Sequence, residues 1–236
     1  HSDNFGHGDF SSFTGPKSCI IYFGYYKHSQ RAIQMLHLET IEPKTLELLR
    51  RLQSLPIFEH SRLVGGTALA LQLGHRKSID LDLFGTIDAS PEEVLEACKE
   101  AGELEISKTS KNINIYWVDG IKVDCVNYPY KWLDECRIPD GIRLASVHDI
   151  AAMKVSAIIN RGTKKDFIDL HFLMKEMSLN KILDLYDQKY PDGSRFIAIK
   201  SLTYFEDAES DPMPYMFSDI TWEEIKVSII NEVRKL

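Results

Sequence analysis

The sequence is poor in cysteine and has no long apolar run. Its 236 residues include four cysteines, Cys19, Cys98, Cys125 and Cys136, and no two of them form a Cys-x-x-Cys pair. This spacing excludes the common zinc-site patterns and a dense disulfide framework, and it favours free thiols in a reducing cytosol. The apolar runs are only a few residues long, too short to cross a bilayer. We therefore expect a cytoplasmic protein without a membrane partner.

The chain also lacks an excess of positive charge. It has 28 Lys and Arg against 35 Asp and Glu, a formal net charge of −7. This balance argues against broad, sequence-independent binding of nucleic acid, which needs an excess of cations. One segment departs from the average: residues 143–165 carry five Lys or Arg against a single Asp. A local basic groove is therefore compatible with the negative net charge of the chain.

Residues 1–34 differ in character from the rest of the chain. They show no helical period and lack the basic segment of a signal peptide, and the first methionine is Met35. We interpret this segment as a non-native or disordered leader. The alternative is a genuine extension that packs through its aromatic residues.

From residue 35 onward the pattern predicts an α+β fold. A mixed α/β lobe is expected over residues 35–140, followed by a helical lobe over 141–236. Ser90-Pro91-Glu92-Glu93 is a capping box, and Asp119-Gly120 is typical of a hairpin turn. Strands are expected at 62–64, 79–84, 104–109, 112–118 and 121–127. Later helices are expected to start after Ser146 and Thr163 and to cover about 178–190, 194–205 and 221–236.

The most informative pattern is Gly65-Gly66-Thr67, followed after twelve intervening residues by Asp80-Leu81-Asp82. Residues two apart on a strand point to one face, so Asp80 and Asp82 should project together. Two adjacent carboxylates repel each other unless a cation lies between them. The glycines let a backbone approach phosphate groups, and a helix beginning at Thr67 directs free N–H groups at them.

Asp124 is the expected third carboxylate. It lies in the strand predicted over 121–127, with Val123 and Cys125 on the opposite face. If this strand lies beside the Asp80–Asp82 strand, the three acids converge. Such a set suits Mg²⁺, with Mn²⁺ as the alternative ion, in a two-metal site for phosphate chemistry.

These motifs resemble a known family. The stretches from Gly65 to Leu71 and from His75 to Phe84, then Lys154 and the run Lys164 to Leu170, are similar to the AbiEii/AbiGii-type nucleotidyltransferases. That family forms the toxin halves of toxin–antitoxin and abortive-infection systems, within the DNA polymerase β-like superfamily. The resemblance covers residues 60–175, roughly half of the chain.

The resemblance implies a nucleotidyltransferase fold and the transfer of a nucleoside monophosphate from a triphosphate to a hydroxyl. It implies an RNA acceptor such as tRNA and an antitoxin protein as partner. Lys154 is implied to contact the triphosphate, Asp166 to lie near the nucleotide or act on the acceptor, and Lys165 and Asp169 to frame Asp166. The expected catalytic residues are therefore Asp80, Asp82, Asp124 and Asp166, of which the first three are the expected metal ligands. The expected nucleotide-binding residues are Gly65, Gly66, Thr67, Lys154, Lys165 and Asp169.

Several of these residues have a structural alternative. Lys154 could be a solvated helix lysine, and Asp166 could complete a capping box from Thr163. Arg76 could pair with Asp80, reach a phosphate or lie on the surface. We expect an active cleft between the two lobes, with Asp80 and Asp82 on one wall and Lys154 and Asp166 on the other, Lys154 at the cleft edge. We also expect Lys164 and Lys165 to guide an acidic acceptor.

At the level of function, the alternative is a catalytically inactive nucleotide-binding or protein-interaction module that keeps the fold. The three aspartates favour the active enzyme.

Overall fold

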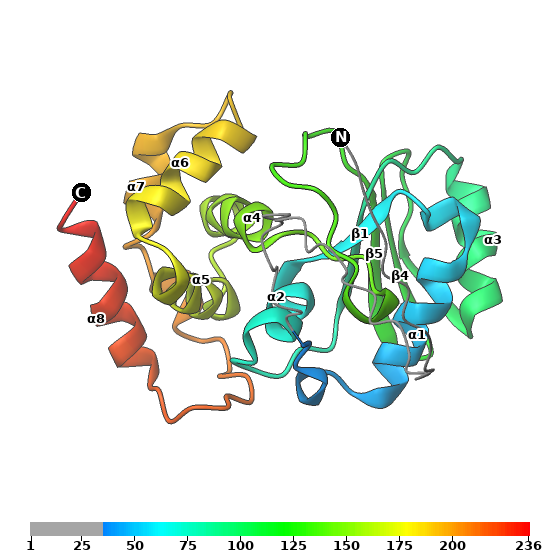
Figure 1. Cartoon of the computed structure of the whole chain (residues 1–236), viewed down its shortest axis with the longest axis horizontal. Helices are drawn as coiled ribbons and strands as arrows, with labels where there is room; N and C mark the ends of the chain where they lie inside the picture. The colour runs from blue at the N-terminus through cyan, green and yellow to red at the C-terminus, as the bar shows by residue number, and fades with distance from the viewer. Residues whose placement is uncertain (1–34) are drawn as a thin grey trace, which may run out of the picture. The chain divides into compact units, whose positions relative to one another are not determined.

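The computed structural model describes residues 35–236, so the leader predicted at 1–34 lies outside the described residues. The described residues belong to one compact unit. A five-stranded mixed sheet is followed along the chain by a group of helices, which confirms the predicted α+β class (Figure 1). The boundary between two lobes at residue 140 stays a prediction.

The sheet has the strand order β1-β2-β5-β4-β3. Only the β2–β5 pair is parallel, and the other three pairs are antiparallel. The hairpin between β4 and β5 turns at Asp119 and Gly120, which both have positive φ, as a type I′ turn requires. The strands are β1 (Ser61–Val64), β2 (Leu81–Gly85), β3 (Leu104–Lys108), β4 (Ile113–Val118) and β5 (Ile121–Asn127).

Strands β2 and β5 alternate buried and partly exposed residues, as their sequences predict. Leu81 and Leu83 of β2 are buried, and so are Val123 and Cys125 of β5. The intervening side chains lie on the opposite face of the sheet because successive strand residues alternate. This alternation brings Asp82 to the less buried face.

Eight α-helices occur in the described part of the chain. Helix α4 lies at the centre of the later helices and packs against α2, α5, α6 and α7, while α1 and α3 lie together beside the sheet (Figure 1). The helices are α1 (Pro43–Ser54), α2 (Gly65–Leu73), α3 (Pro91–Ala101), α4 (Val147–Asn160), α5 (Lys164–Glu176), α6 (Leu179–Lys189), α7 (Arg195–Ser201) and α8 (Trp222–Val233).

Helix α2 begins earlier than the sequence suggests. We expected a turn at Gly65-Gly66 and a helix from Thr67, but both glycines form the first turn of α2 directly after β1. The helix contacts β1 and β2 on one side and α4 and α5 on the other. It therefore connects the sheet to the helical part of the molecule.

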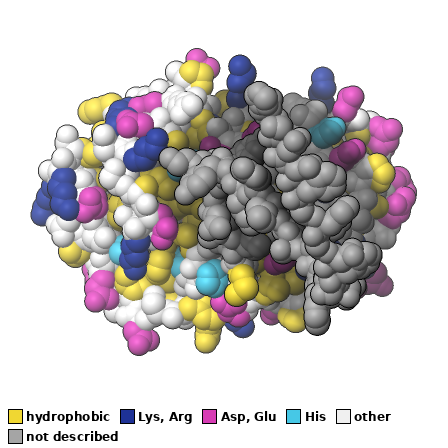
Figure 2. Space-filling model, in the orientation of Figure 1, with side chains coloured by type: hydrophobic (Ala, Val, Ile, Leu, Met, Phe, Trp, Pro, Cys, Tyr) yellow, Lys and Arg dark blue, Asp and Glu magenta, His cyan; other side chains and the backbone are white. Residues whose placement is uncertain are grey.

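Charges of both signs are interspersed over the described part of the face shown in Figure 2. This distribution agrees with the moderate net charge of −7 and gives no broad basic surface on that face. Within residues 35–236, every helix is too short or too polar to cross a membrane.

Candidate active site

The acids Asp82 and Asp124 lie on neighbouring parallel strands. They are register partners in the β2–β5 pair. Strand β5 therefore lies beside the strand of Asp82, which is the condition stated above for the acids to converge. Burial, and next the charge of Asp124, raise the pKa of Asp82 to about 6, against the opposing effects of Lys154 and Lys122. Burial and the neighbouring carboxylate therefore both disfavour the ionised form of Asp82.

Asp80 lies just before the first residue of β2, two positions from Asp82. Its backbone carbonyl accepts a hydrogen bond from the Thr67 hydroxyl, whose oxygen also lies 2.9 Å from Ser78 Oγ. Thr67 therefore fastens the start of β2 to the first turn of α2. This is a positioning role for Thr67, in addition to the phosphate contact predicted for its N–H group.

The donor set fits a hard divalent cation. Mg²⁺ binds one or two carboxylates and takes its remaining ligands from water and phosphate, and Asp82 and Asp124 offer such a pair. Across residues 35–236 no group of three or more His, Cys, Asp or Glu side chains is placed to hold an ion. Lys122 forms an ion pair with the Asp124 carboxylate, with Nζ 2.7 Å from Oδ1. The metal set of Asp80, Asp82 and Asp124 stays a prediction.

The glycine pair serves close packing within the protein. Gly65 has a φ of +69°, and a Cβ at this position would collide with Asp82 Oδ2. A Cβ on Gly66 would collide with Arg76 Nη2. The space beside each glycine is thus occupied by a side chain of the site, Asp82 at Gly65 and Arg76 at Gly66.

We predict that Gly65→Ala disrupts the site while Gly120→Ala does not. Both residues have positive φ, so each alanine carries a backbone strain of about 1–2 kcal/mol. Only at Gly65 would the added Cβ also collide with another side chain, that of Asp82, since a Cβ on Gly120 would meet nothing within 4 Å. Displacing Asp82 should lower the rate of nucleotidyl transfer by roughly 10²-fold. Rate assays and thermal melts of both variants measure this, and equal rate losses would contradict it.

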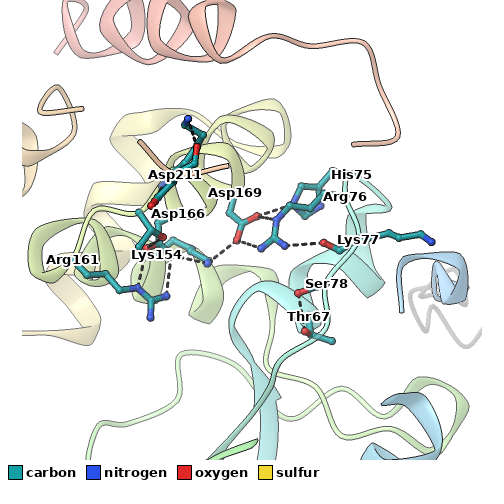
Figure 3. Close-up of polar contacts among 12 residues, drawn as sticks. Thr67, His75, Arg76, Lys77, Ser78, Lys154, Arg161, Asp166, Asp169 and Asp211 are labelled. Carbon is teal, nitrogen blue, oxygen red and sulfur yellow. Dashed lines mark hydrogen bonds and ion pairs between the residues drawn. The ribbon is translucent and has the colours of Figure 1, made fainter. Parts of the chain in front are cut away.

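Asp169 of α5 is the centre of a buried charge network (Figure 3). Arg76 donates to both of its oxygens, with Nε at 2.7 Å and Nη2 at 2.9 Å. His75 Nε2 lies 2.8 Å from Oδ1, and Lys154 Nζ lies 2.6 Å from Oδ2. Burial opposes ionisation, but the charges of Arg76 and Lys154 outweigh it and hold the pKa of Asp169 well below its ordinary value. Asp169 is therefore a structural anion.

Asp166 lies one turn earlier and is also paired. It receives Lys154 Nζ at 2.9 Å, Arg161 Nε at 2.9 Å and the Thr163 hydroxyl at 2.7 Å. Burial acts to raise its pKa, but Lys154 and Arg161 lower the pKa below the ordinary carboxyl range. An acid of this kind is a poor proton acceptor near neutral pH.

Several side chains are placed differently from our expectations. Lys154 is neither solvated nor at a cleft edge but buried between two aspartates. Arg76 is buried on Asp169 instead of lying on the surface or pairing with Asp80. A charged group can be buried when its partners compensate the lost hydration. Hydrophobic periodicity alone does not reveal such partners.

Two expectations for the start of α5 are also wrong. Thr163 occupies the N-cap position, but its side chain donates to the Asp166 carboxylate and makes no cap hydrogen bond. Lys164 is buried, and its ammonium donates to the backbone carbonyls of Glu209 and Asp211, so it cannot guide an acceptor. Lys165 is exposed and free for that role.

One cavity of about 330 Å³ brings most of the predicted residues together. We call it the polar cavity. Gly66 and Thr67 of α2 line it beside Asp80 and Asp82. Its other lining residues are Arg76, Ser78, Lys122, Lys154, Arg161, Thr163, Lys165, Asp166, Asp211 and Pro212. Asp80 and Asp82 thus share one cavity with Lys154 and Lys165, whereas the predicted residues Asp124, Gly65 and Asp169 are not among its lining residues.

Lys122 and Arg161 line this cavity but were not predicted as site residues. Lys122 lies two residues before Asp124, so strand alternation places it on the same face, and this spacing could have identified it. Arg161 follows the last residue of α4 and reaches Asp166 on the next helix. Its position in the basic segment 143–165 was the available indication.

Comparisons of the sequence with known proteins give a family and a relative. A sequence model of the family described as nucleotidyl transferase AbiEii toxin, type IV toxin–antitoxin system, matches residues 47–235. The uncharacterized protein aq_aa25 of Aquifex aeolicus is 36% identical over 198 residues, covering 80% of this chain and 94% of that protein.

Solved structures share the fold. JHP933 from Helicobacter pylori superposes with a TM-score of 0.57 at 21% identity, covering 84% of this chain and 90% of that one. MenT4, a nucleotidyltransferase toxin from Mycobacterium tuberculosis, superposes with a TM-score of 0.52 at 15% identity, covering 83% and 86%. With the family match over most of its length, the chain belongs to the AbiEii nucleotidyl transferase toxin family.

Proposed function

We propose that this protein transfers a nucleoside monophosphate from a nucleoside triphosphate to a hydroxyl of an RNA acceptor, in a reaction that requires Mg²⁺. The observation that carries the proposal is the polar cavity, which Asp80 and Asp82 line together with Lys154, Arg161 and Lys165 and with the first turn of α2. A triphosphate needs both a cation-rich surface and a metal, because its charges are repelled by bare carboxylates. The cavity combines a group of cations with the carboxylates that are proposed to hold the metal.

In this proposal the β- and γ-phosphates lie in the polar cavity. Lys165 and Arg161 have exposed side chains there, and Gly66 and Thr67 are in the first turn of α2, where backbone N–H groups have no helical partner. Lys154 adds a buried charge behind them. Asp166 and Asp169 hold that lysine in place, so their role is to position it.

Asp82 and Asp124 would hold the metal with Asp80 beside them, and Mg²⁺ when bound would neutralise charge on the reacting phosphate and lower the pKa of the acceptor hydroxyl. The proton of that hydroxyl passes to the Asp82–Asp124 pair. Asp166 is unsuitable for this task because its pKa lies below the ordinary range.

We propose that the acceptor is RNA. We also propose that an antitoxin protein is the binding partner of this chain in the cell. The toxin–antitoxin description of the family supports the second part. Exposed Lys165 at the cavity supports the first, since an RNA backbone is a polyanion.

Thermal shift with nucleotide and metal separates an active site from an inactive module. We expect each productive triphosphate to raise the melting temperature only when Mg²⁺ is present. At about 100 times the Kd the stabilisation is about 2.7 kcal/mol, equivalent to about 5–10 °C for a domain of this size. The matched control is Asp82→Asn, which should show no metal-dependent shift. Shifts of equal size without Mg²⁺ would favour a nucleotide-binding module without the metal site.

A further inference from the structure

A second cavity adjoins the polar cavity and differs from it in chemistry. It has a volume of about 320 Å³ and is lined mainly by aromatic and apolar side chains of β2, α4 and the segments after β5 and α6. We call it the aromatic cavity. It shares three lining residues with the polar cavity: Asp82, Lys154 and Arg161.

The two cavities lie on opposite sides of Asp82. Asp80, Asp82 and Phe84 are two residues apart along the chain at β2, where alternate residues share a face. Asp80 lines the polar cavity, Asp82 lines both, and Phe84 lines the aromatic cavity. The adjacent glycines also line different cavities: Gly66 lines the polar cavity and Gly65 lines the aromatic cavity. Asp82 therefore lies at the border between the two cavities.

Four aromatic rings form the wall of the aromatic cavity. Tyr128 packs against Phe84 at 5.4 Å and against Tyr130 at 5.3 Å between ring centroids. Tyr130 meets Tyr190 edge to face at 4.8 Å, and the hydroxyls of Tyr128 and Tyr190 lie 2.7 Å apart. Tyr130 is nevertheless 44% exposed. The rings are thus fixed by one another while Tyr130 keeps surface available for a ligand.

We propose that the aromatic cavity binds the terminal nucleobase of a single-stranded nucleic-acid acceptor. The proposal rests on the function proposed above. Phosphoryl transfer places the attacking and leaving oxygens in line on opposite sides of phosphorus. With pyrophosphate in the polar cavity and the α-phosphate at Asp82, the acceptor hydroxyl must enter from the aromatic side.

The reaction balances with this arrangement. A bond forms between the acceptor oxygen and the α-phosphorus, and the bond from that phosphorus to the bridging oxygen breaks. Pyrophosphate carries away the bonding electrons, and the hydroxyl proton passes to the Asp82–Asp124 pair. No other reactant is needed.

The lining of the aromatic cavity favours a nucleobase over a polycationic acceptor. Among its described lining residues Asp82 is the single acid, and Lys154 and Arg161 are cations. Unstacked bases bind to aromatic side chains and use polar groups at their edges. Ser156 and Asn160 of α4 line the same cavity and supply such groups.

The test compares two probes on three forms of the full chain. The probes are a 5′-fluorescein single-stranded RNA decamer and the same decamer with an abasic 3′-terminal residue, measured by fluorescence anisotropy. The proteins are the wild type, Tyr130→Ala and Tyr130→Phe. The wild type should bind the intact decamer at least about five-fold more tightly, as expected for one stacked base. Tyr130→Ala should lose this difference, and Tyr130→Phe should keep it because the ring remains.

Controls separate this proposal from the proposed function. Tyr204→Ala removes a tyrosine that is 53% exposed and lies outside both cavities, and it should bind like the wild type. Affinity of Tyr130→Ala for each NTP with Mg²⁺ should also equal that of the wild type. The proposal is overturned if Tyr130→Ala still binds the intact decamer more tightly than the abasic one. It is also overturned if Tyr130→Ala loses affinity only for the NTP. Transfer of labelled NTP by the wild type reports separately on the proposed function.

Discussion

Asp82→Asn is expected to abolish nucleotidyl transfer while the protein remains folded. The carboxylate faces the polar cavity and is a proposed metal ligand, so its loss removes charge at the reacting phosphate. Removing one such electrostatic group typically lowers a rate by roughly 10²–10³-fold, and a metal ligand should cost at least that much. Asp80→Asn should act in the same direction. Steady-state transfer assays with each NTP measure the effect, with circular dichroism to verify the fold. Full activity in both variants would remove the basis of the metal site.

The same variant has a stability effect with a definite sign. Because the pKa of Asp82 is raised to about 6 in the folded protein, ionisation at higher pH costs folding free energy. Without metal, Asp82→Asn should therefore melt at a higher temperature than the wild type at about pH 7. The difference should shrink as the pH falls toward about 4, where Asp82 is protonated in the folded state. A lower melting temperature for Asp82→Asn at about pH 7 would contradict this electrostatic account.

The largest stability loss is expected for Asp169→Ala. This side chain is fully buried and compensates Arg76 and Lys154, which are themselves buried. Breaking a buried ion pair by removing one partner costs about 3–5 kcal/mol, because the remaining charge stays without hydration. Chemical denaturation should show this loss at about pH 7 and also near pH 4, since the pKa of Asp169 is held well below 3.8.

Asp184→Ala is the matched control for that measurement. Its carboxylate pairs with Arg195 at 2.9 Å, but the side chain is 55% exposed. Exposed ion pairs contribute about 0–1 kcal/mol, so this alanine should change stability little. Similar losses for Asp169→Ala and Asp184→Ala would show that the buried network does not support the fold.

Much of the fold can be predicted from local patterns. The alternation of apolar residues predicted β2 and β5 on the correct faces, and the Ser90 capping box is present as expected. The turn at Asp119-Gly120 follows from the requirement for positive φ. The start of α2 was misplaced because a Gly-Gly pair is typical of a turn, whereas here both residues begin the helix.

The buried charges could not be predicted in the same way. Lys154 and Asp169 are fifteen positions apart on successive helices, and Arg76 comes from a distant loop. Sequence spacing indicates which residues share one helix or strand, but it does not give the pairing between elements. The family resemblance identified Lys154, Asp166 and Asp169, whereas their mutual pairing required the structure.

Transfer of label is the most direct test of the central claim. The full chain is incubated with each α-³²P-labelled NTP, Mg²⁺ and total RNA, and products are separated on a denaturing gel. We predict label on RNA from at least one NTP with the wild type, and none with Asp82→Asn or without Mg²⁺. Absence of label on RNA from all four NTPs with the folded wild type would contradict the proposed acceptor, and label transferred equally by Asp82→Asn would contradict the site.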